Sequence, residues 1–141
     1  MNLEGFLKQN AMHNENIKYV ASNRFVDEKG DPIQWEIKAI SSKEDEQIRN
    51  SATKKVQVPN KKGQYTQELD ANKYIGLLAS YCTVYPNLND AKLQDSYSTM
   101  SADELLKAML LPGEYADYLL KVQDICGFDK SQSDLVEEAK N

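Results

Sequence analysis

The amino-acid sequence predicts an α+β fold in which an N-terminal helix and a β-hairpin are followed by a mostly α-helical bundle. Two runs with strand-like alternation flank a turn sequence within residues 17–40, and apolar residues at helical spacing dominate from residue 70 onward. The length of 141 residues matches one ordinary domain, which can bury a hydrophobic core without disulfide or metal cross-links. We therefore predict a single domain over residues 1–141.

The first 40 residues contain a predicted helix and a predicted β-hairpin. The helix has four apolar residues at the spacing of one face: Leu3, Phe6, Leu7 and Ala11. The hairpin turns at "EKGDP", where Gly30 and Pro32 separate two alternating runs. One face of the second run holds Ile33, Trp35, Ile37 and Ala39. This pattern assigns Trp35 to the core rather than to a ligand-binding platform.

A second helix is predicted to begin in "SSKEDEQIRNSATK". A serine that precedes an acidic residue by three positions is typical of a helix N-terminus, and both Ser41 with Glu44 and Ser42 with Asp45 fit this pattern. The consecutive acids Glu44, Asp45 and Glu46 splay around such a helix, whereas a hard cation needs several oxygen atoms that converge on one point. The segment is therefore interpreted as a solvated helix start and not as a metal site.

The next stretch is strongly basic. Residues 49–67 carry a local charge of +5 and no acidic residue, although the whole chain has a formal net charge of −5. The five cations are Arg49, Lys54, Lys55, Lys61 and Lys62. Because Pro59, Asn60 and Gly63 interrupt regular structure, we expect a mobile basic loop over about residues 54–67, or a loose hairpin. This segment fits a solvated loop, a protein contact or a nucleic-acid contact.

Helical periodicity predicts the rest of the chain, beginning with a stripe of Ala71, Tyr74, Ile75, Leu78, Tyr81 and Cys82. The stretch "YPNLNDAKLQDSY", residues 85–97, contains acids and tyrosines that could perform chemistry. Pro86 opposes continuation of the preceding helix, and Asn87 or Asn89 can cap a new short helix. Asp90 then falls in the first turn, where a carboxylate is stabilised by the positive helix terminus. We interpret this stretch as architecture.

Two further helices complete the predicted bundle. Ser101 with Glu104 repeats the capping pattern before the apolar residues Leu105, Leu106, Met109 and Leu110. Pro112 and Gly113 predict a corner, and Gly127 predicts the end of the last clear helix. The apolar stripe of that helix is Tyr115, Tyr118, Leu119, Val122, Ile125 and Cys126. The two cysteines, Cys82 and Cys126, are expected to be buried and reduced.

The sequence contains little that indicates catalysis. His13 is the only histidine, and no nucleotide-binding, zinc-protease or nucleophile-elbow motif occurs. We therefore predict a protein that is not an enzyme and that has no cofactor and no bound metal. The net charge of −5 disfavours general binding to nucleic acid or anionic membranes, and no run approaches the length of a membrane span. These features predict a cytoplasmic protein.

Three stretches together resemble the XkdN-like family of phage tail assembly chaperones, which come from contractile-tailed phages and defective prophages of Gram-positive bacteria. These stretches are "NIKYVASNRFVDEKGDPIQWEI", "YPNLNDAKLQDSY" and "MLLPGEYADYLLKVQDICGFDK". They occur in the expected order and at the expected separations, and the resemblance covers nearly the whole chain. It implies a nonenzymatic helper that binds the tape measure protein and keeps it soluble while the tail tube polymerises around it. Such a helper acts in the bacterial host cytoplasm and leaves before the virion matures.

The contact surface for this partner is predicted at two places. One is the basic segment, with Lys54, Lys55, Lys61, Lys62 and Tyr65, and the other is the final helix, with Leu135 and Val136. Both places have a plainer interpretation, as a solvated loop and as a helix docked on the core. The alternative function is a small nucleic-acid-binding module, or another phage adaptor, that uses residues 49–67. A homo-oligomer is compatible with the sequence.

The last three residues suggest a longer form of the protein. The resemblance implies that such chaperones are often made in two lengths, the longer by a backward ribosomal slip, and that the extension recruits the tail tube protein. Ala139, Lys140 and Asn141 permit the codons GCA AAA AAC, which contain the slippery heptamer A AAA AAC. Alanine has four codons, so a plain stop after a short surface helix fits the protein sequence equally well.

Overall fold

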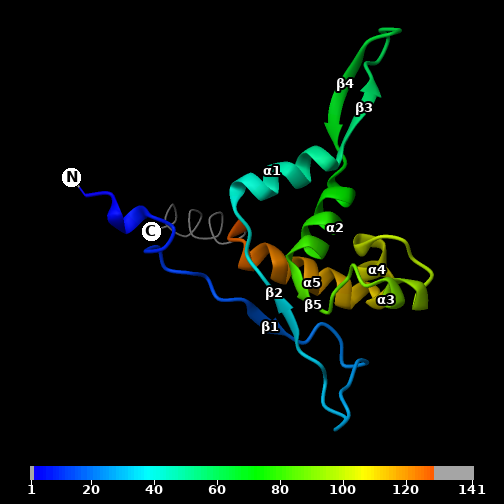
Figure 1. Ribbon diagram of the computed structural model, residues 1–141. Helices are drawn as coiled ribbons and strands as arrows, with labels where there is room; N and C mark the ends of the chain where they lie inside the picture. The colour runs from blue at the N-terminus through cyan, green and yellow to red at the C-terminus, as the bar shows by residue number, and fades with distance from the viewer. Residues whose placement is uncertain (1, 129–141) are drawn as a thin grey trace, which may run out of the picture.

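The computed structural model describes residues 2–128 and has the α+β fold that the sequence predicts (Figure 1). Two short antiparallel sheets alternate along the chain with the helices. In order, the elements are the 3-10 helix η1 (Glu4–Phe6), β1 (Ile17–Tyr19), β2 (Trp35–Ile37), α1 (Ser42–Ser51), β3 (Thr53–Gln57), β4 (Tyr65–Leu69), α2 (Ala71–Cys82), β5 (Thr83–Tyr85), α3 (Ala91–Ser96), α4 (Ala102–Met109) and α5 (Pro112–Ile125).

The first sheet has the strand order β1-β2-β5, with both neighbouring pairs antiparallel. β1 and β2 form the predicted hairpin, in which Ile17 lies opposite Ile37 and Tyr19 lies opposite Trp35. Trp35 and Ile37 are buried while Glu36 between them is only half-buried, so the predicted alternation is confirmed. β5 was not predicted, because its three residues directly continue the helical pattern of α2.

Side-chain caps fix where the helices begin. The Ser41 hydroxyl accepts a hydrogen bond from the Glu44 amide at 3.2 Å, and the Glu44 carboxylate accepts one from the Ser41 amide at 3.4 Å, which forms a capping box. The stretch of residues 85–97 is architecture, as predicted, but its cap differs. Asp90 itself is the N-cap of α3 and accepts from the Leu93 amide at 2.9 Å, so neither Asn87 nor Asn89 holds that position.

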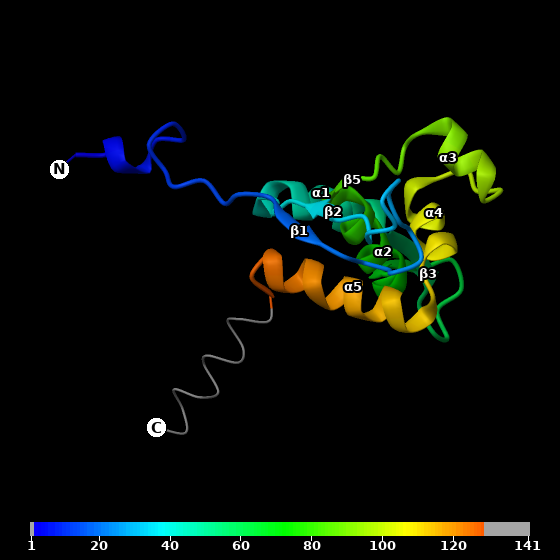
Figure 2. The same cartoon turned by 90° about the horizontal axis from the view of Figure 1, so that it is seen from below.

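The core lies where α2 packs against α1, α4 and α5, while one face of the first sheet packs on α5 (Figure 2). Trp35 contacts Tyr118 edge to face at a ring-centroid distance of 5.3 Å, and Tyr19 lies 6.0 Å from the same ring. The Tyr118 hydroxyl, which is buried, is hydrogen-bonded to the Thr83 hydroxyl. These aromatic contacts connect the first sheet to α5. Each such pair contributes about 0.5–1.5 kcal/mol in addition to the free energy gained by burying its surface.

Several helical predictions need correction. The predicted helix over Leu3 to Ala11 is reduced to the three residues of η1, all exposed, because none of the residues from 2 to 128 covers its apolar face and a short isolated helix is marginal. In α2, Ala71 and Tyr81 are exposed although the predicted stripe includes them. Pro112, which was predicted to mark a corner, is the first residue of α5. A proline is well tolerated there, because the backbone amide at this position has no partner within the helix.

The two cysteines are free thiols whose sulfur atoms lie 3.8 Å apart. Cys82 at the end of α2 is buried, and Cys126 at the C-cap of α5 is half-buried. Hydrogen bonding between the thiols, together with burial, raises the pKa of Cys82, whereas the same bond lowers the pKa of Cys126. Gly127 follows with a φ of 86°, and it ends α5 as predicted. Across residues 2–128, every helix is too short or too polar to cross a membrane.

Candidate protein interface

The basic segment, for which the sequence allowed a mobile loop or a loose hairpin, forms a regular β-hairpin. β3 and β4 pair over their full lengths, from Thr53 opposite Leu69 to Gln57 opposite Tyr65. The residues that interrupt regular structure are confined to the turn, where Asn60 and Gly63 have φ values of 65° and 83°. The turn-forming residues therefore connect two strands and do not disrupt them.

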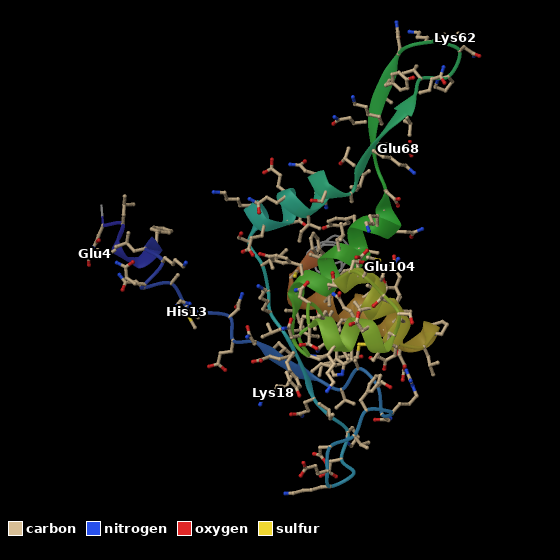
Figure 3. The ribbon with its side chains drawn as sticks, turned by 45° about the vertical axis from the view of Figure 1, so that its right-hand side comes forward. Glu4, His13, Lys18, Lys62, Glu68 and Glu104 are labelled. Carbon is tan, nitrogen blue, oxygen red and sulfur yellow. The ribbon has the colours of Figure 1, made fainter. Side chains whose placement is uncertain are left out.

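The hairpin stands on the junction between α1 and α2 and projects away from the helices, with Lys62 at its tip (Figure 3). At its base, the Asp70 amide donates a hydrogen bond to the Ala52 carbonyl at 2.8 Å. Asp70 also caps α2 by accepting from the Lys73 amide at 3.1 Å. The two ends of the hairpin are thus held together by the helices that flank it, while every residue from Lys61 to Leu69 is exposed.

The structure does not gather the predicted contact residues into one patch. Paired residues across a ribbon share a face, so Lys55 and Tyr65 lie on one face of the hairpin and Lys54 lies on the other, opposite Glu68. Lys61 and Lys62 belong to the turn. All four lysines are exposed, and none of them forms an ion pair within residues 2–128.

The other cation of the segment and the other predicted contact residues differ in where they lie and in how exposed they are. Arg49, the fifth cation of the segment, lies on α1 and is paired with Asp45 at 2.9 Å, so it does not extend the free basic surface. Tyr65 has 63% of its surface exposed, which is unusual for a tyrosine that no partner covers. Leu135 and Val136 lie outside the residues that the structure describes, as do the three residues of the predicted slippery codons.

Sequence reasoning missed a groove between α1 and α2. Its volume is about 260 Å³, and it is lined by Glu44, Gln47, Ile48, Ser51, Leu77 and Tyr81. Tyr81 forms one wall: its hydroxyl donates to the Glu44 carboxylate at 2.7 Å, and the Lys38 ammonium lies 4.6 Å from its ring centre. Tyr81 falls on the apolar stripe of α2, so its spacing predicted burial. Tyr81 is nevertheless exposed, because of the way in which α1 crosses α2.

The titratable groups near this surface are explained by packing. The hydrogen bond from Tyr81 is the main cause that lowers the pKa of Glu44, and the same bond raises the pKa of Tyr81. Burial first, and then the hydrogen bond to Asp45, raises the pKa of Tyr74 to about 12. Each shift favours the protonation state that the side chain already has at neutral pH, so none of these groups is tuned for proton transfer.

Two ion pairs connect distant parts of the fold. Lys73 on α2 lies 2.8 Å from the buried Asp103 carboxylate on α4, and Arg24 lies 2.9 Å from Glu114 on α5. Hydrogen bonds from Ser22 and Arg24, and from the Leu111 amide, lower the pKa of Glu114 to about 2.

Within residues 2–128, no three histidine, cysteine or acidic residues cluster where they could hold a metal ion.

Known proteins resemble this chain in sequence and in fold. The model of the phage XkdN-like tail assembly chaperone protein family matches residues 3–140. Two relatives from Bacillus subtilis (strain 168) are each 35% identical over 99% of this chain and 93% of their own length: the phage-like element PBSX protein XkdN and the uncharacterized protein YqbN. The crystal structure of the protein YqbN superposes with a TM-score of 0.77 at 27% identity, and the match covers 91% of this chain and 98% of that one.

Proposed function

Because this chain belongs to the phage XkdN-like tail assembly chaperone family, we propose that it binds the tape measure protein and keeps it soluble until tail tube subunits polymerise around it. The match of the family model to residues 3–140 is the observation that carries this proposal. The helper acts by binding and performs no chemistry. It works in the cytoplasm of the bacterial host and is released before the virion is complete.

The basic hairpin is the part of the molecule that we assign to the client. Its four free lysines project beyond the helices, in a chain whose formal net charge is −5. Such a local reversal of charge attracts an acidic surface while the rest of the molecule repels it, which gives orientation and speed to the encounter. The exposed ring of Tyr65, on the same face as Lys55, adds the aromatic contact that protein interfaces favour.

Co-expression tests this proposal directly. The tape measure gene of the same phage is expressed with and without this chain, and the soluble fraction of the tape measure protein is measured. We expect that protein to remain soluble and to co-purify with this chain only when both are present. A tape measure protein that is equally soluble alone, or that fails to co-purify, would overturn the proposal.

The alternative of nucleic-acid binding predicts a different result in the same preparation. A hairpin that neutralises phosphates should bind duplex DNA or RNA with an affinity that falls steeply as salt rises. We expect no such binding at 0.15 M salt, because the acidic remainder of the chain opposes it. Tight, salt-dependent binding to nucleic acid would instead show that the hairpin is a nucleic-acid-binding element.

A longer form would connect the chaperone to the tail tube protein. We propose that the ribosomal slip at codons 139–141 produces this form and that its extension recruits tube subunits. The gene sequence tests the proposal: it should read A AAA AAC across these codons, with an overlapping open frame downstream. A different 3′ sequence removes the longer form and leaves the chaperone assignment in place.

A further inference from the structure

The chain has two cysteines, and the fold brings them together across 44 positions of the sequence. Cys82 is the last residue of α2, Cys126 is the C-cap of α5, and these two helices pack against each other (Figure 2). The two sulfur atoms lie 3.8 Å apart, close to the contact distance of two sulfur atoms, and both thiols are free. The proposed function of the protein uses neither thiol.

Backbone hydrogen bonds hold both cysteines in place. The Cys82 carbonyl accepts from the Lys38 amide at 2.9 Å, which fixes the end of α2 against the residue that follows β2. The Cys126 amide donates to the carbonyl of the buried Val122 at 3.0 Å and so belongs to the last turn of α5. The short distance between the sulfur atoms is therefore set by two packed helices and not by an exposed loop.

A disulfide between these cysteines requires only a small movement. The sulfur atoms of a disulfide are about 2.05 Å apart, so the two atoms must approach by about 1.8 Å from their distance of 3.8 Å. Rotation about the Cα–Cβ bond moves a cysteine sulfur atom without moving the backbone. Small rotations of both side chains, together with slight adjustment of the helix ends, close this gap.

The two thiols differ in access and in charge. Cys82 has none of its surface exposed, whereas Cys126 is half-buried, where a negative charge on sulfur is less costly. Hydrogen bonds from the Cys82 thiol and from the Ile40 amide lower the pKa of Cys126, although burial and the Asp45 carboxylate oppose them. Because the thiolate is the nucleophilic form of cysteine, Cys126 is the thiol that can meet and attack an oxidant.

We propose that Cys126 and Cys82 form a reversible oxidation site for hydroperoxides, at which Cys126 reacts first and Cys82 resolves the product as a disulfide. In the first step, the Cys126 thiolate attacks one oxygen atom of hydrogen peroxide, the O–O bond breaks and hydroxide leaves, which gives a sulfenic acid. In the second step, the Cys82 sulfur attacks the Cys126 sulfur, and the S–O bond breaks. The departing hydroxyl group takes the Cys82 proton and leaves as water.

The reaction balances and can be reversed. Two thiols and one molecule of hydrogen peroxide give one disulfide and two molecules of water, and the two sulfur atoms lose the two electrons that the peroxide gains. Two small-molecule thiols reverse the change: the first attacks the disulfide, and the second releases the remaining cysteine and forms the small-molecule disulfide. In a reducing compartment a protein disulfide of this kind is transient.

The disulfide should stabilise the fold. It would join the ends of α2 and α5 and enclose a loop that contains β5, α3 and α4. A cross-link across such a loop restricts the unfolded chain more than the folded one. For a domain of this size, the midpoint of thermal unfolding should rise by about 5–15 °C on oxidation.

Treatment of the intact protein with a tenfold excess of hydrogen peroxide tests the proposal. Both free thiols should disappear, the protein should stay monomeric on a nonreducing gel, and dithiothreitol should restore both thiols. The exposed Met12 and Met100 side chains also react with peroxide. The mass is therefore measured on the peptides that contain the cysteines, which should be joined and lack two hydrogen atoms.

Two single variants assign the roles of the thiols. In Cys82→Ala, which keeps an apolar side chain in the core, peroxide should convert Cys126 to a sulfenic acid that dimedone traps. In Cys126→Ser, the buried Cys82 thiol should react at least tenfold more slowly than Cys126 does in the first variant. The Cys126→Ser protein is also the matched control for stability, because it keeps every methionine. Peroxide should leave its midpoint of thermal unfolding unchanged.

The wild-type experiment decides the proposal even if a variant folds poorly. Survival of both thiols in excess peroxide, formation of disulfide-linked dimers, or a midpoint of thermal unfolding that does not rise would each overturn it. Equal reaction rates for the two thiols in the single variants would overturn the assignment of Cys126 as the thiol that reacts first. None of these measurements depends on the tape measure protein, so the proposed function and this site are tested separately.

Discussion

Removing the four lysines of the hairpin should separate client binding from folding. The variant carries Lys54→Ser, Lys55→Ser, Lys61→Ser and Lys62→Ser, all at exposed positions without an ion pair in the described part of the chain. Exposed substitutions of this kind usually change the free energy of unfolding by less than about 0.5 kcal/mol each. The midpoint of thermal unfolding should therefore stay close to that of the wild type.

Client binding should fall by much more. An exposed ion pair contributes about 0.2–1 kcal/mol, so the loss of four such contacts should cost about 1–4 kcal/mol of binding free energy. At about 1.4 kcal/mol per tenfold change, the dissociation constant for the tape measure protein should rise about fivefold to several-hundredfold at low salt. The difference from wild type should shrink at 0.5 M salt, because the screening length falls well below 10 Å.

A matched variant controls for net charge. Replacing Lys18, Lys29, Lys43 and Lys92 with serine also removes four positive charges, which takes the formal net charge from −5 to −9 in both proteins, but it leaves the hairpin intact. Only the hairpin variant should lose affinity. Equal affinities for the two variants would show that overall charge, and not the hairpin, governs binding. A large loss of thermal stability in the hairpin variant would refute its assignment as a free surface.

Three further predictions concern the fold. Asp90→Ala should lower the free energy of unfolding, measured in urea, by about 1 kcal/mol, because it removes the cap of α3. A loss of function without a loss of stability would indicate a chemical role for Asp90. Leu78→Ala should cost about 2–5 kcal/mol, since Leu78 is fully buried, and a smaller loss would show that the core collapses around it. The lowered pKa of Glu114 stabilises the fold above about pH 4.5, and this contribution is lost as the pH falls toward 2. Glu114→Gln should therefore flatten the acid side of the stability profile, and an unchanged profile would contradict the role of its hydrogen bonds.

The sequence predicted those parts of the fold in which local chemistry and burial agree. The two candidate capping pairs, Ser41 with Glu44 and Ser42 with Asp45, predicted the start of α1 to within one residue, because a capping box needs only neighbouring residues, and the structure selects the first pair. The alternation around Trp35 gave the central strand, and the stripe through Tyr118 and Val122 gave α5. In each case the residues that form the element also carry the pattern that reveals it.

The missed features depend on contacts between distant segments. β5 exists because its residues pair with β2, and although Thr83, Val84 and Tyr85 are of types that strands favour, a run of three residues is too short to predict a strand. The groove arises where α1 crosses α2, and spacing within α2 alone placed Tyr81 in the core. Conversely, the helix predicted from Leu3 to Ala11 has the spacing of an apolar helical face, but the part of the chain that the structure describes offers that face no surface to pack on. Periodicity shows that a face is apolar but does not identify what covers it.

The hydrogen bond from the Asp70 amide to the Ala52 carbonyl makes the hairpin an exchangeable part of the molecule. Its two ends already meet at the helix junction, so the length and sequence between them can change with little penalty to the remaining fold. On the proposed assignment of the hairpin to the client, a lineage of phages can therefore change its client preference by replacing residues 53–69 while it retains the same packed helices. In the laboratory, the same junction is a site at which hairpins from related chaperones can be grafted, and an exchange of client with the hairpin would support that assignment.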